Sequence, residues 1–204
     1  DARVKVGSTA LSDVDVTTGG ARLTFGFDTL DDTLFPRRGQ RLGFRVDFAR
    51  TSLGARRNYE TWRASLDTYW SFGRHTLAIG FDAATSDDAD DIIEETNFLG
   101  GFLNLSGLDR GAVVGPHAGV ARIVYHRRTG RIGQSLLDWP LYFGGSLEAG
   151  NAWARRADIN SDSLILNASA FVRVDTLLGP VYLAGGFGES GESSIYLFIG
   201  ASPD

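Results

Sequence analysis

The chain has 204 residues, with 20 lysines and arginines against 25 aspartates and glutamates, and a formal net charge of −5. This acidic balance, without a basic block, gives no electrostatic footprint for nucleic acid, so we expect no nucleic-acid partner. The absence of cysteine excludes disulfides, thiolate metal ligands and cysteine nucleophiles, and no apolar run approaches the ~20 residues that a transmembrane helix needs.

The chain has a hydrophobic period of two. Near the start, Leu23, Phe25 and Phe27 alternate with polar or small residues, which is typical of a strand with one apolar and one polar face. The same alternation recurs to the end of the chain and predicts about ten strands. The predicted strands are 2–8, 20–31, 40–52, 59–72, 75–86, 117–128, 141–154, 163–176, 180–188 and 194–201.

These predicted strands favour a membrane. Many exceed the ~5–6 residues usual in globular proteins and reach the ~9–11 residues that a tilted membrane strand needs. Tight turns such as 73–74 and 179–180 alternate with long segments such as 87–116, as in outer-membrane barrels. A soluble β-sandwich or a lipocalin-like barrel is the alternative. We expect Leu23, Phe25, Phe44, Val46, Leu66, Ile79, Leu166, Val172 and Leu197 to face lipid, and Arg45, Arg63, Asp67, Glu148, Arg173 and Asp175 to face the lumen.

One turn has a distinctive pattern. Asp28 ends a predicted strand, and Phe35, Pro36 and Gly39 follow before the next strand begins. Pro36 fixes φ in the turn, and Gly39 permits the positive φ that restarts the strand. This segment resembles the strand–turn–strand signature of the BamA-type outer-membrane barrel superfamily, in which a strand ending in Asp is followed by Phe-Pro, a variable pair and Gly.

A glycine-rich, largely apolar segment over 97–111 resembles the loop that enters the barrel lumen in that family. Gly100, Gly101 and Gly107 match the family pattern, whereas Ser106 stands where the family has arginine. In the family that arginine pairs inside the barrel with an acidic residue of a later strand.

Glu148 matches this acidic position. A buried carboxylate is costly unless it is paired, so we expect it to find a cation, with Arg110 as the substitute for the missing arginine. The alternative is that Glu148 lies in lumen water.

The resemblance spans roughly residues 20–200, and residues 117–154 look closest to the barrels of patatin-like phospholipase autotransporters. It implies a single outer-membrane barrel domain over 1–204. Because the family barrel has sixteen strands, the ten strands predicted here either close on themselves, pair with a second copy or form the C-terminal part of a larger barrel. Because the chain lacks methionine, we expect a processed form or a fragment. If these residues were a whole barrel, Val4–Gly7 would have to pair with Ile195–Ile199, since an edge exposed to lipid leaves backbone groups unpaired.

The function that the resemblance implies is to anchor or translocate an N-terminal passenger, a patatin-like lipase that is absent from this chain. We expect the bacterial outer membrane as its location, and its lipids, the barrel-assembly machinery, the passenger in cis and a second copy as partners. An insertase-type assembly factor and a small structural or porin-like barrel are the alternatives. No serine lies in a Gly-x-Ser-x-Gly elbow, so we expect no catalytic site, and we expect no metal and no cofactor.

Overall fold

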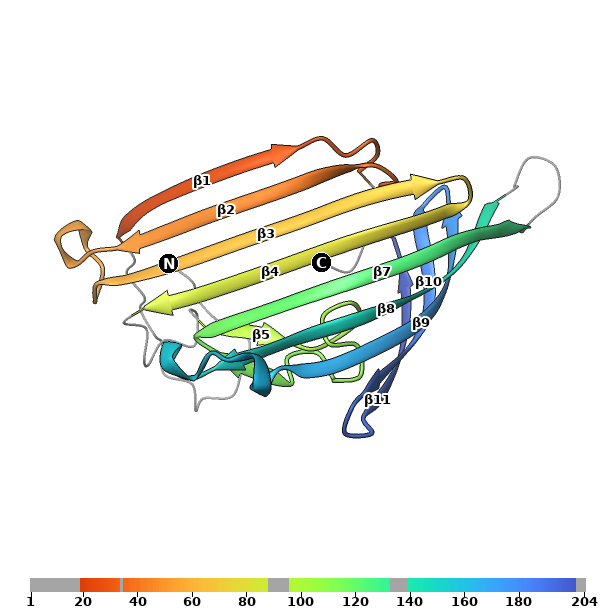
Figure 1. Ribbon diagram of the computed structural model, residues 1–204. Coiled ribbons are helices and arrows are strands. Elements are labelled where there is room, and N and C mark those ends of the chain that lie inside the picture. The colour runs from red at the N-terminus through yellow and green to blue at the C-terminus, as the bar shows by residue number, and fades with distance from the viewer. Residues whose placement is uncertain (1–18, 34, 88–95, 133–138, 201–204) are drawn as a thin grey trace, which may run out of the picture.

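A computed structural model describes residues 19–33, 35–87, 96–132 and 139–200 of the chain. They form a nine-stranded antiparallel sheet in the order β1-β2-β3-β4-β7-β8-β9-β10-β11, together with a small sheet of β5 and β6 (Figure 1). The strands are β1 (Gly20–Asp28), β2 (Gly39–Ala49), β3 (Tyr59–Phe72), β4 (His75–Asp87), β5 (Asn97–Leu99), β6 (Val113–Gly115), β7 (His117–Ile132), β8 (Trp139–Trp153), β9 (Ile165–Thr176), β10 (Gly179–Gly188) and β11 (Ser193–Ile199), with short 3-10 turns η1 (Thr51–Leu53), η3 (Arg156–Asp158) and η4 (Ser161–Ser163).

The prediction of an all-β, antiparallel chain is confirmed. Nine of the ten predicted strands lie within the described residues and occur in the predicted order. The largest difference is in β7, which continues past the predicted end at residue 128 to Ile132 after a register shift between Arg128 and Gly130. The predicted strand 2–8 lies outside the described residues. The short strands β5 and β6 were not predicted.

Strand length follows the membrane pattern. Seven of the nine strands in the large sheet have ten residues or more, and β7 has 16. Strands of this length span the hydrocarbon layer when tilted. The part of the chain that the structure describes contains no helix that is long and apolar enough to cross a membrane.

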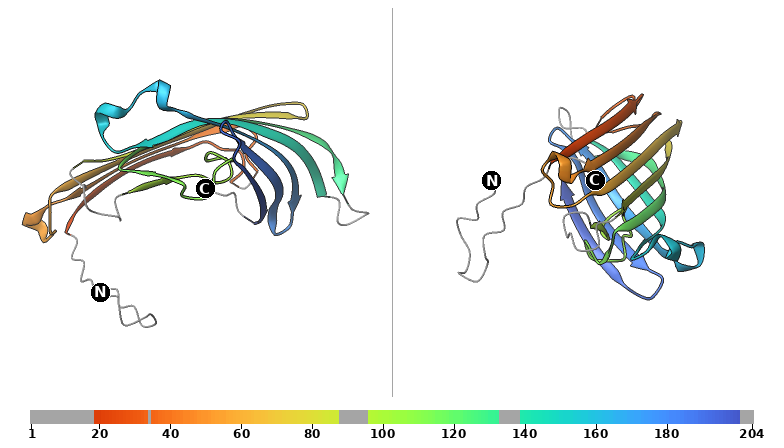
Figure 2. Two further views of the ribbon diagram at one scale, coloured as in Figure 1. Left: turned by 90° about the horizontal axis from the view of Figure 1, so that it is seen from below. Right: turned by 90° about the vertical axis from the view of Figure 1, so that its left-hand side faces the viewer.

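The sheet is strongly curved, and the segment from β5 to β6 lies on its concave side (Figure 2). Residues directly opposite each other in neighbouring strands share a face, so the register assigns every strand position. One row of the convex face runs through Leu66, Phe81, Ala121 and Ala149. All nine side chains expected to face lipid belong to this face, with exposures as high as 67% for Leu197.

Val46 is the exception in degree. It lies on the convex face but is only 2% exposed. Trp62 stands directly opposite it, and the Trp62 ring lies 5.8 Å from that of Phe44 and 6.4 Å from that of Phe48. The alternation correctly predicted that Val46 lies on the convex face, but the aromatic rings of this cluster cover its side chain.

The concave face is polar along β1–β4 and mixed along β7–β11. All six charged residues expected to face the lumen lie on it: Arg45, Arg63, Asp67, Glu148, Arg173 and Asp175. Its apolar part is a core of Ala78, Val124, Phe171 and Ala184 packed around Phe102 of the β5–β6 segment. The packed core therefore lies on the concave side of the curved sheet (the inside of the arch), whereas the large apolar surface lies on its convex side.

β1 and β11 form the two edges of the nine-stranded sheet. The pairing expected between Val4–Gly7 and Ile195–Ile199 involves residues outside the described part of the chain. Ile195, Leu197 and Ile199 continue the convex apolar surface to this edge.

A pair of neighbouring substitutions tests the two faces. If the convex face contacts hydrocarbon, Phe25→Arg should destabilise the protein by ~2–4 kcal/mol, the cost of an arginine at the midplane of a barrel's outer face. Gly26→Arg is the matched control, because Gly26 lies on the concave face and a Cβ there has no heavy atom within 4 Å. Urea-dependent folding into lipid vesicles measures both, and equal losses would contradict the assignment of the faces.

Candidate functional site

The segment between β5 and β6 is a compact loop whose ends are pinned together. Asn97, Phe98 and Leu99 pair with Gly115, Val114 and Val113, and residues 100–112 form the loop between them. Gly100 and Gly101 have φ of 120° and 110°, and a Cβ on Gly100 would lie 2.1 Å from the carbonyl oxygen of Asp109. Both glycines are therefore needed for the loop to turn back on itself.

Apolar side chains hold the loop against the sheet. Phe102 packs edge-on to Phe171, with ring centroids 5.7 Å apart, and contacts Tyr182 and Phe198. Leu105 is completely buried in a second cluster with Leu99, Ala118 and Val120. The loop thus fills the concave face over β7–β11. Its hydrophobic composition, unusual for a solvated loop, is explained by this packing.

The loop tip binds the carboxylate of Glu148, which is only 3% exposed on β8. The Ser106 backbone N–H donates to Glu148 Oε2 at 2.6 Å, and the Ser106 hydroxyl donates to Oε1 at 2.6 Å. Ser146, two residues earlier on the same face of β8, donates a third hydrogen bond to Oε1 at 2.5 Å. Hydrogen bonds to an ionised acceptor are about twice as strong as neutral ones.

A second layer orients these donors. Because the Ser146 hydroxyl donates to Glu148, it accepts from Ser169 Oγ, which lies 2.6 Å away on β9. The Leu103 N–H donates to Ser106 Oγ at 2.8 Å, which directs the Ser106 hydroxyl proton toward the carboxylate. The network therefore runs from the loop backbone through Glu148 to two strands of the sheet.

The expected pairing of Glu148 with Arg110 is wrong. Arg110 is exposed, and within residues 19–33, 35–87, 96–132 and 139–200 Glu148 forms no ion pair. The physical reason is the close approach of Ser106: a short side chain lets the loop backbone reach the carboxylate itself, so an amide and two hydroxyls replace a guanidinium. The expected alternative, a carboxylate in lumen water, is also contradicted by this burial.

Close approach of the tip requires glycine on both sides of the contact. A Cβ on Gly186 of β10 would lie 1.8 Å from the Ser106 carbonyl oxygen, and a Cβ on Gly107 would lie 2.1 Å from the Gly188 nitrogen. The Gly107 N–H donates to Asn167 Oδ1 at 2.7 Å. Tyr196 of β11 donates its hydroxyl to the carbonyls of Ser106 at 2.8 Å and Leu108 at 3.0 Å.

Four residues of this site were not identified from the sequence: Ser146, Asn167, Ser169 and Tyr196. Their position on the lumen face could be read from the alternation, but their convergence on one loop depends on the register of three strands. Gly186 gave a signal, since Gly185-Gly186 interrupts an apolar strand, which indicates close backbone approach.

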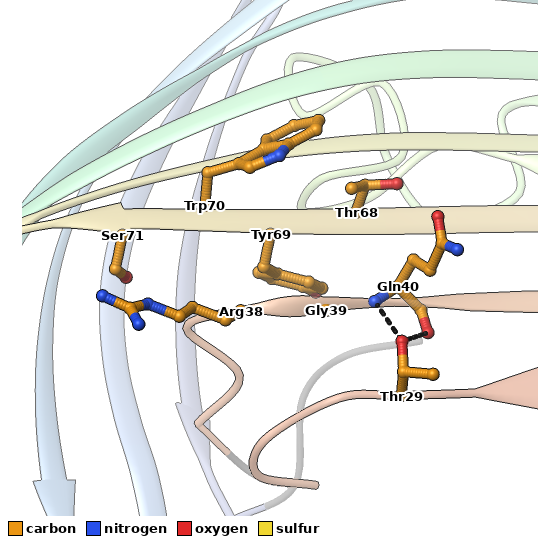
Figure 3. Close-up of a pocket in the computed structure, with 8 residues that line it drawn as sticks. All are labelled: Thr29, Arg38, Gly39, Gln40, Thr68, Tyr69, Trp70 and Ser71. Atoms are coloured by element: carbon orange, nitrogen blue, oxygen red, sulfur yellow. Dashed lines mark hydrogen bonds between the residues drawn. The ribbon is translucent and has the colours of Figure 1, made fainter.

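The turn between β1 and β2 is also placed as the sequence predicts. Gly39 has a φ of 103°, and a Cβ there would lie 2.2 Å from the Thr29 carbonyl oxygen. Thr29 Oγ1 accepts from the Gln40 N–H at 3.1 Å and donates to the Gln40 carbonyl at 3.2 Å. A hollow of about 400 Å³ lies beside this turn, and in Figure 3 Tyr69 points to one side of β3 and Trp70 to the other.

Aspartates organise the turn, and only Asp28 was singled out from the sequence. Asp28 accepts from the Leu30 N–H at 2.9 Å and from Arg41 Nε at 2.9 Å. Asp31 accepts from the backbone N–H groups of Arg37 and Arg38 at 2.8 and 3.0 Å. The Arg37 N–H lowers the pKa of the Asp31 carboxyl below its ordinary value.

The turn also reaches the far side of the arch. The Arg173 guanidinium on β9 lies 5.8 Å from the centre of the Phe35 ring and 4.1 Å from that of Tyr142. Arg173 is buried and pairs with Asp175 at 2.8 Å. Phe35, predicted only as part of a turn motif, therefore contacts a strand more than 130 positions later in the chain, by a cation–π interaction.

The contacts of these sites join the loop and the turn to the sheet. The Glu148 carboxylate accepts three hydrogen bonds, two from the loop and one from Ser146 of β8. Among the described residues no three histidine, aspartate or glutamate side chains gather as they would around a metal ion. What the arrangement does is fasten a loop inside a curved sheet.

A membrane barrel wall with an inserted loop is the class of protein that this fold and site define. No family model matches the chain, and no curated protein does. Among solved structures it is similar to the crystal structure of BamA from Haemophilus ducreyi lacking POTRA domains 1–3, with a TM-score of 0.70 over 89% of this chain at 12% identity. The chain spans 42% of that BamA chain.

The chain therefore has the fold of a BamA-type barrel over less than half the length of the matched protein. This confirms the predicted fold. The closer likeness to the barrels of patatin-like phospholipase autotransporters stays a prediction.

Removing one hydroxyl tests the tip contact. Ser106→Ala should weaken loop docking by ~1.5–3 kcal/mol, because it removes a hydrogen bond to a charged acceptor. Hydrogen–deuterium exchange of amides 103–108 should become about 10–100 times faster. Ser194→Ala is the matched control, since the bond that Ser194 donates to the loop, to the Gly107 carbonyl, is long at 3.4 Å and does not involve Glu148. Equal exchange in the two variants would show that the Glu148 contact does not hold the loop.

A methyl group added to β10 tests the close approach between the loop tip and this strand. Gly186→Ala places a Cβ against the Ser106 carbonyl, so the tip should leave its site and become sensitive to protease. Gly26→Ala adds the same methyl on the same face where nothing lies within 4 Å, and should leave the loop protected. Limited proteolysis with mass spectrometry distinguishes them. A loop that stays protected in both variants would show that the tip does not need glycine at position 186.

Proposed function

We propose that this chain forms part of the wall of a bacterial outer-membrane β-barrel, and that its task is to anchor or translocate a passenger domain at its N-terminal side. The observation that carries the proposal is the pair of opposite faces. The convex face is apolar across nine strands, whereas the concave face holds charged residues and a docked loop. Hydrocarbon outside and a polar lumen inside are what such a surface requires.

The lumen side supports the proposal in its detail. Along β3–β7, Arg122 bridges Asp67 at 2.9 Å and Asp82 at 2.6 Å across Gly80. Arg22 and Arg63 both pair with Asp47 along β1–β3. Paired charges of this kind suit a water-filled interior, while the docked loop narrows that interior over β7–β11. The concave face is thus polar along β1–β4 and filled by the loop along β7–β11. Such an interior fits a barrel that translocates or anchors a passenger better than it fits an open pore.

The sequence resemblance implies a role in handling polypeptide, and the fold of the chain agrees with that resemblance. The proposed partners are outer-membrane lipids, the barrel-assembly machinery and the passenger in cis, which the resemblance identifies as a patatin-like lipase. On this proposal the chain itself contributes no catalysis. A second copy is the remaining proposed partner.

Surface exposure of the passenger tests this function. In cells that produce the full-length gene product with an epitope tag before residue 1, the tag should fractionate with the outer membrane. Added protease should remove the tag from intact cells, and Gly186→Ala should reduce the exposed fraction while Gly26→Ala does not.

Other outcomes identify other functions. Loss of other outer-membrane proteins on depletion, without any exposed tag, would mean an assembly factor. Conductance in planar bilayers that does not change when the loop is deleted would mean a porin-like barrel. Either result overturns the passenger proposal and leaves the membrane wall itself intact.

A further inference from the structure

The convex face contains a groove whose floor is made of small residues. Ala64, Ala83 and Gly119 stand opposite one another in β3, β4 and β7. The neighbouring row toward one end of the strands is Trp62, Thr85, His117 and Trp153, and the row on the other side includes Phe81 and Ala121. The resulting groove has a volume of about 460 Å³, within the usual range of ligand pockets.

The groove is elongated. It extends from Phe44 on β2 to Trp153 on β8, which crosses five neighbouring strands of the sheet and corresponds to roughly 19 Å at the usual strand spacing. The groove volume, spread over this length, leaves room for a slender ligand in preference to a compact one.

A segment of the chain overhangs one end of the groove. The connection between β8 and β9 stands on the convex side of the sheet (Figure 2), and its Ile159 and Leu164 line the groove. Trp153 Nε1 donates to Ser163 Oγ at 2.8 Å, and Asn151 Nδ2 donates to the Ser163 carbonyl at 2.6 Å. The overhang is thus tied to the sheet, and the polar edge of the Trp153 indole is directed to it.

Two polar side chains of the groove bond to each other. Thr85 Oγ1 and His117 Nδ1 lie 2.5 Å apart, and His117 is buried. Most of the other lining residues contribute methyl groups and aromatic rings, among them Ala64, Ala83, Ala121 and Phe81. A tryptophan with its apolar ring in the groove and its N–H on a polar segment is the arrangement found at the membrane interface.

We propose that this groove binds one acyl chain of a membrane lipid, which enters beside Trp153 and lies over Ala83 and Ala121. The inference rests on the proposed function, because it requires the convex face to be in the bilayer. Short turns join β3 to β4 and β9 to β10 at the opposite end of the strands. By the outer-membrane rule that short turns face the periplasm, the lipid belongs to the outer leaflet.

Filling the floor of the groove tests the proposal. The full-length protein is reconstituted in vesicles of dioleoylphosphatidylglycerol, extracted in mild detergent and measured by native mass spectrometry. One lipid should remain bound per chain. Ala83→Leu with Ala121→Leu should lower the bound fraction by about tenfold, whereas Ala170→Leu, on the same face in β9, should leave it unchanged. Equal retention in the filled and control variants, or no retained lipid in the unmodified protein, overturns the proposal.

Fluorescence quenching locates the lipid, and it tests the groove separately from the proposal that the chain is part of a membrane barrel. In a variant that keeps Trp153 as its single tryptophan, a retained lipid with brominated acyl chains should quench the Trp153 emission. The same variant with Ala83→Leu and Ala121→Leu added should lose that quenching. With Trp70 as the single tryptophan, brominated bilayers should quench emission in both chains, because Trp70 lies on the convex face far from the groove. Absence of Trp70 quenching refutes the membrane wall, whereas retention of Trp153 quenching in the filled chain refutes only the groove.

Discussion

The antiparallel ladder that joins β1 to β11 is the constraint on which the rest of the structure depends. In a strand the side-chain period is two, so a slip of one residue would exchange the convex and concave faces of every strand beyond it. Arg122 reaches Asp67 across Gly80 only because the ladder places β3, β4 and β7 in this register. The charges on the concave face make a one-residue slip costly, since it would move them to the apolar face.

The inserted loop has two structural roles: it covers apolar residues of the concave face, and it supplies hydrogen-bond donors to a buried carboxylate. A wide arch leaves its concave apolar residues without partners, and Phe102 and Leu105 supply them. A buried carboxylate also needs donors, and Ser106 supplies two. Because the positive φ values of Leu103 and Leu105 are uncommon for residues with a Cβ, the loop holds a conformation that it would not adopt without the sheet. Docking energy therefore stabilises a strained backbone.

The sequence contained the strands but only part of the site. Alternation locates β3 and β4 almost to the residue, because each strand in lipid must be long and two-faced. Glu148 could be assigned a lumen position for the same reason. Its contacts could not, because Ser106 reaches it only through the path of the loop, and Ser169 reaches Ser146 only through the register between β8 and β9. The predicted partner Arg110 was wrong because opposite charge alone does not determine contact. The path of the loop backbone brings Ser106, and not Arg110, to Glu148.

The last strand shows how the loop and the ladder depend on each other. One edge of β11 has no partner among the described residues, and an edge in hydrocarbon leaves backbone groups unpaired at several kcal/mol each. β11 is also the shortest strand of the large sheet, with seven residues. Tyr196 nevertheless binds two loop carbonyls, and Phe198 packs on Phe102. The loop thus ties the edge strand to Glu148 from inside the arch. Releasing the tip would remove these side-chain contacts, so the stability of the edge strand would then depend more on its ladder to β10.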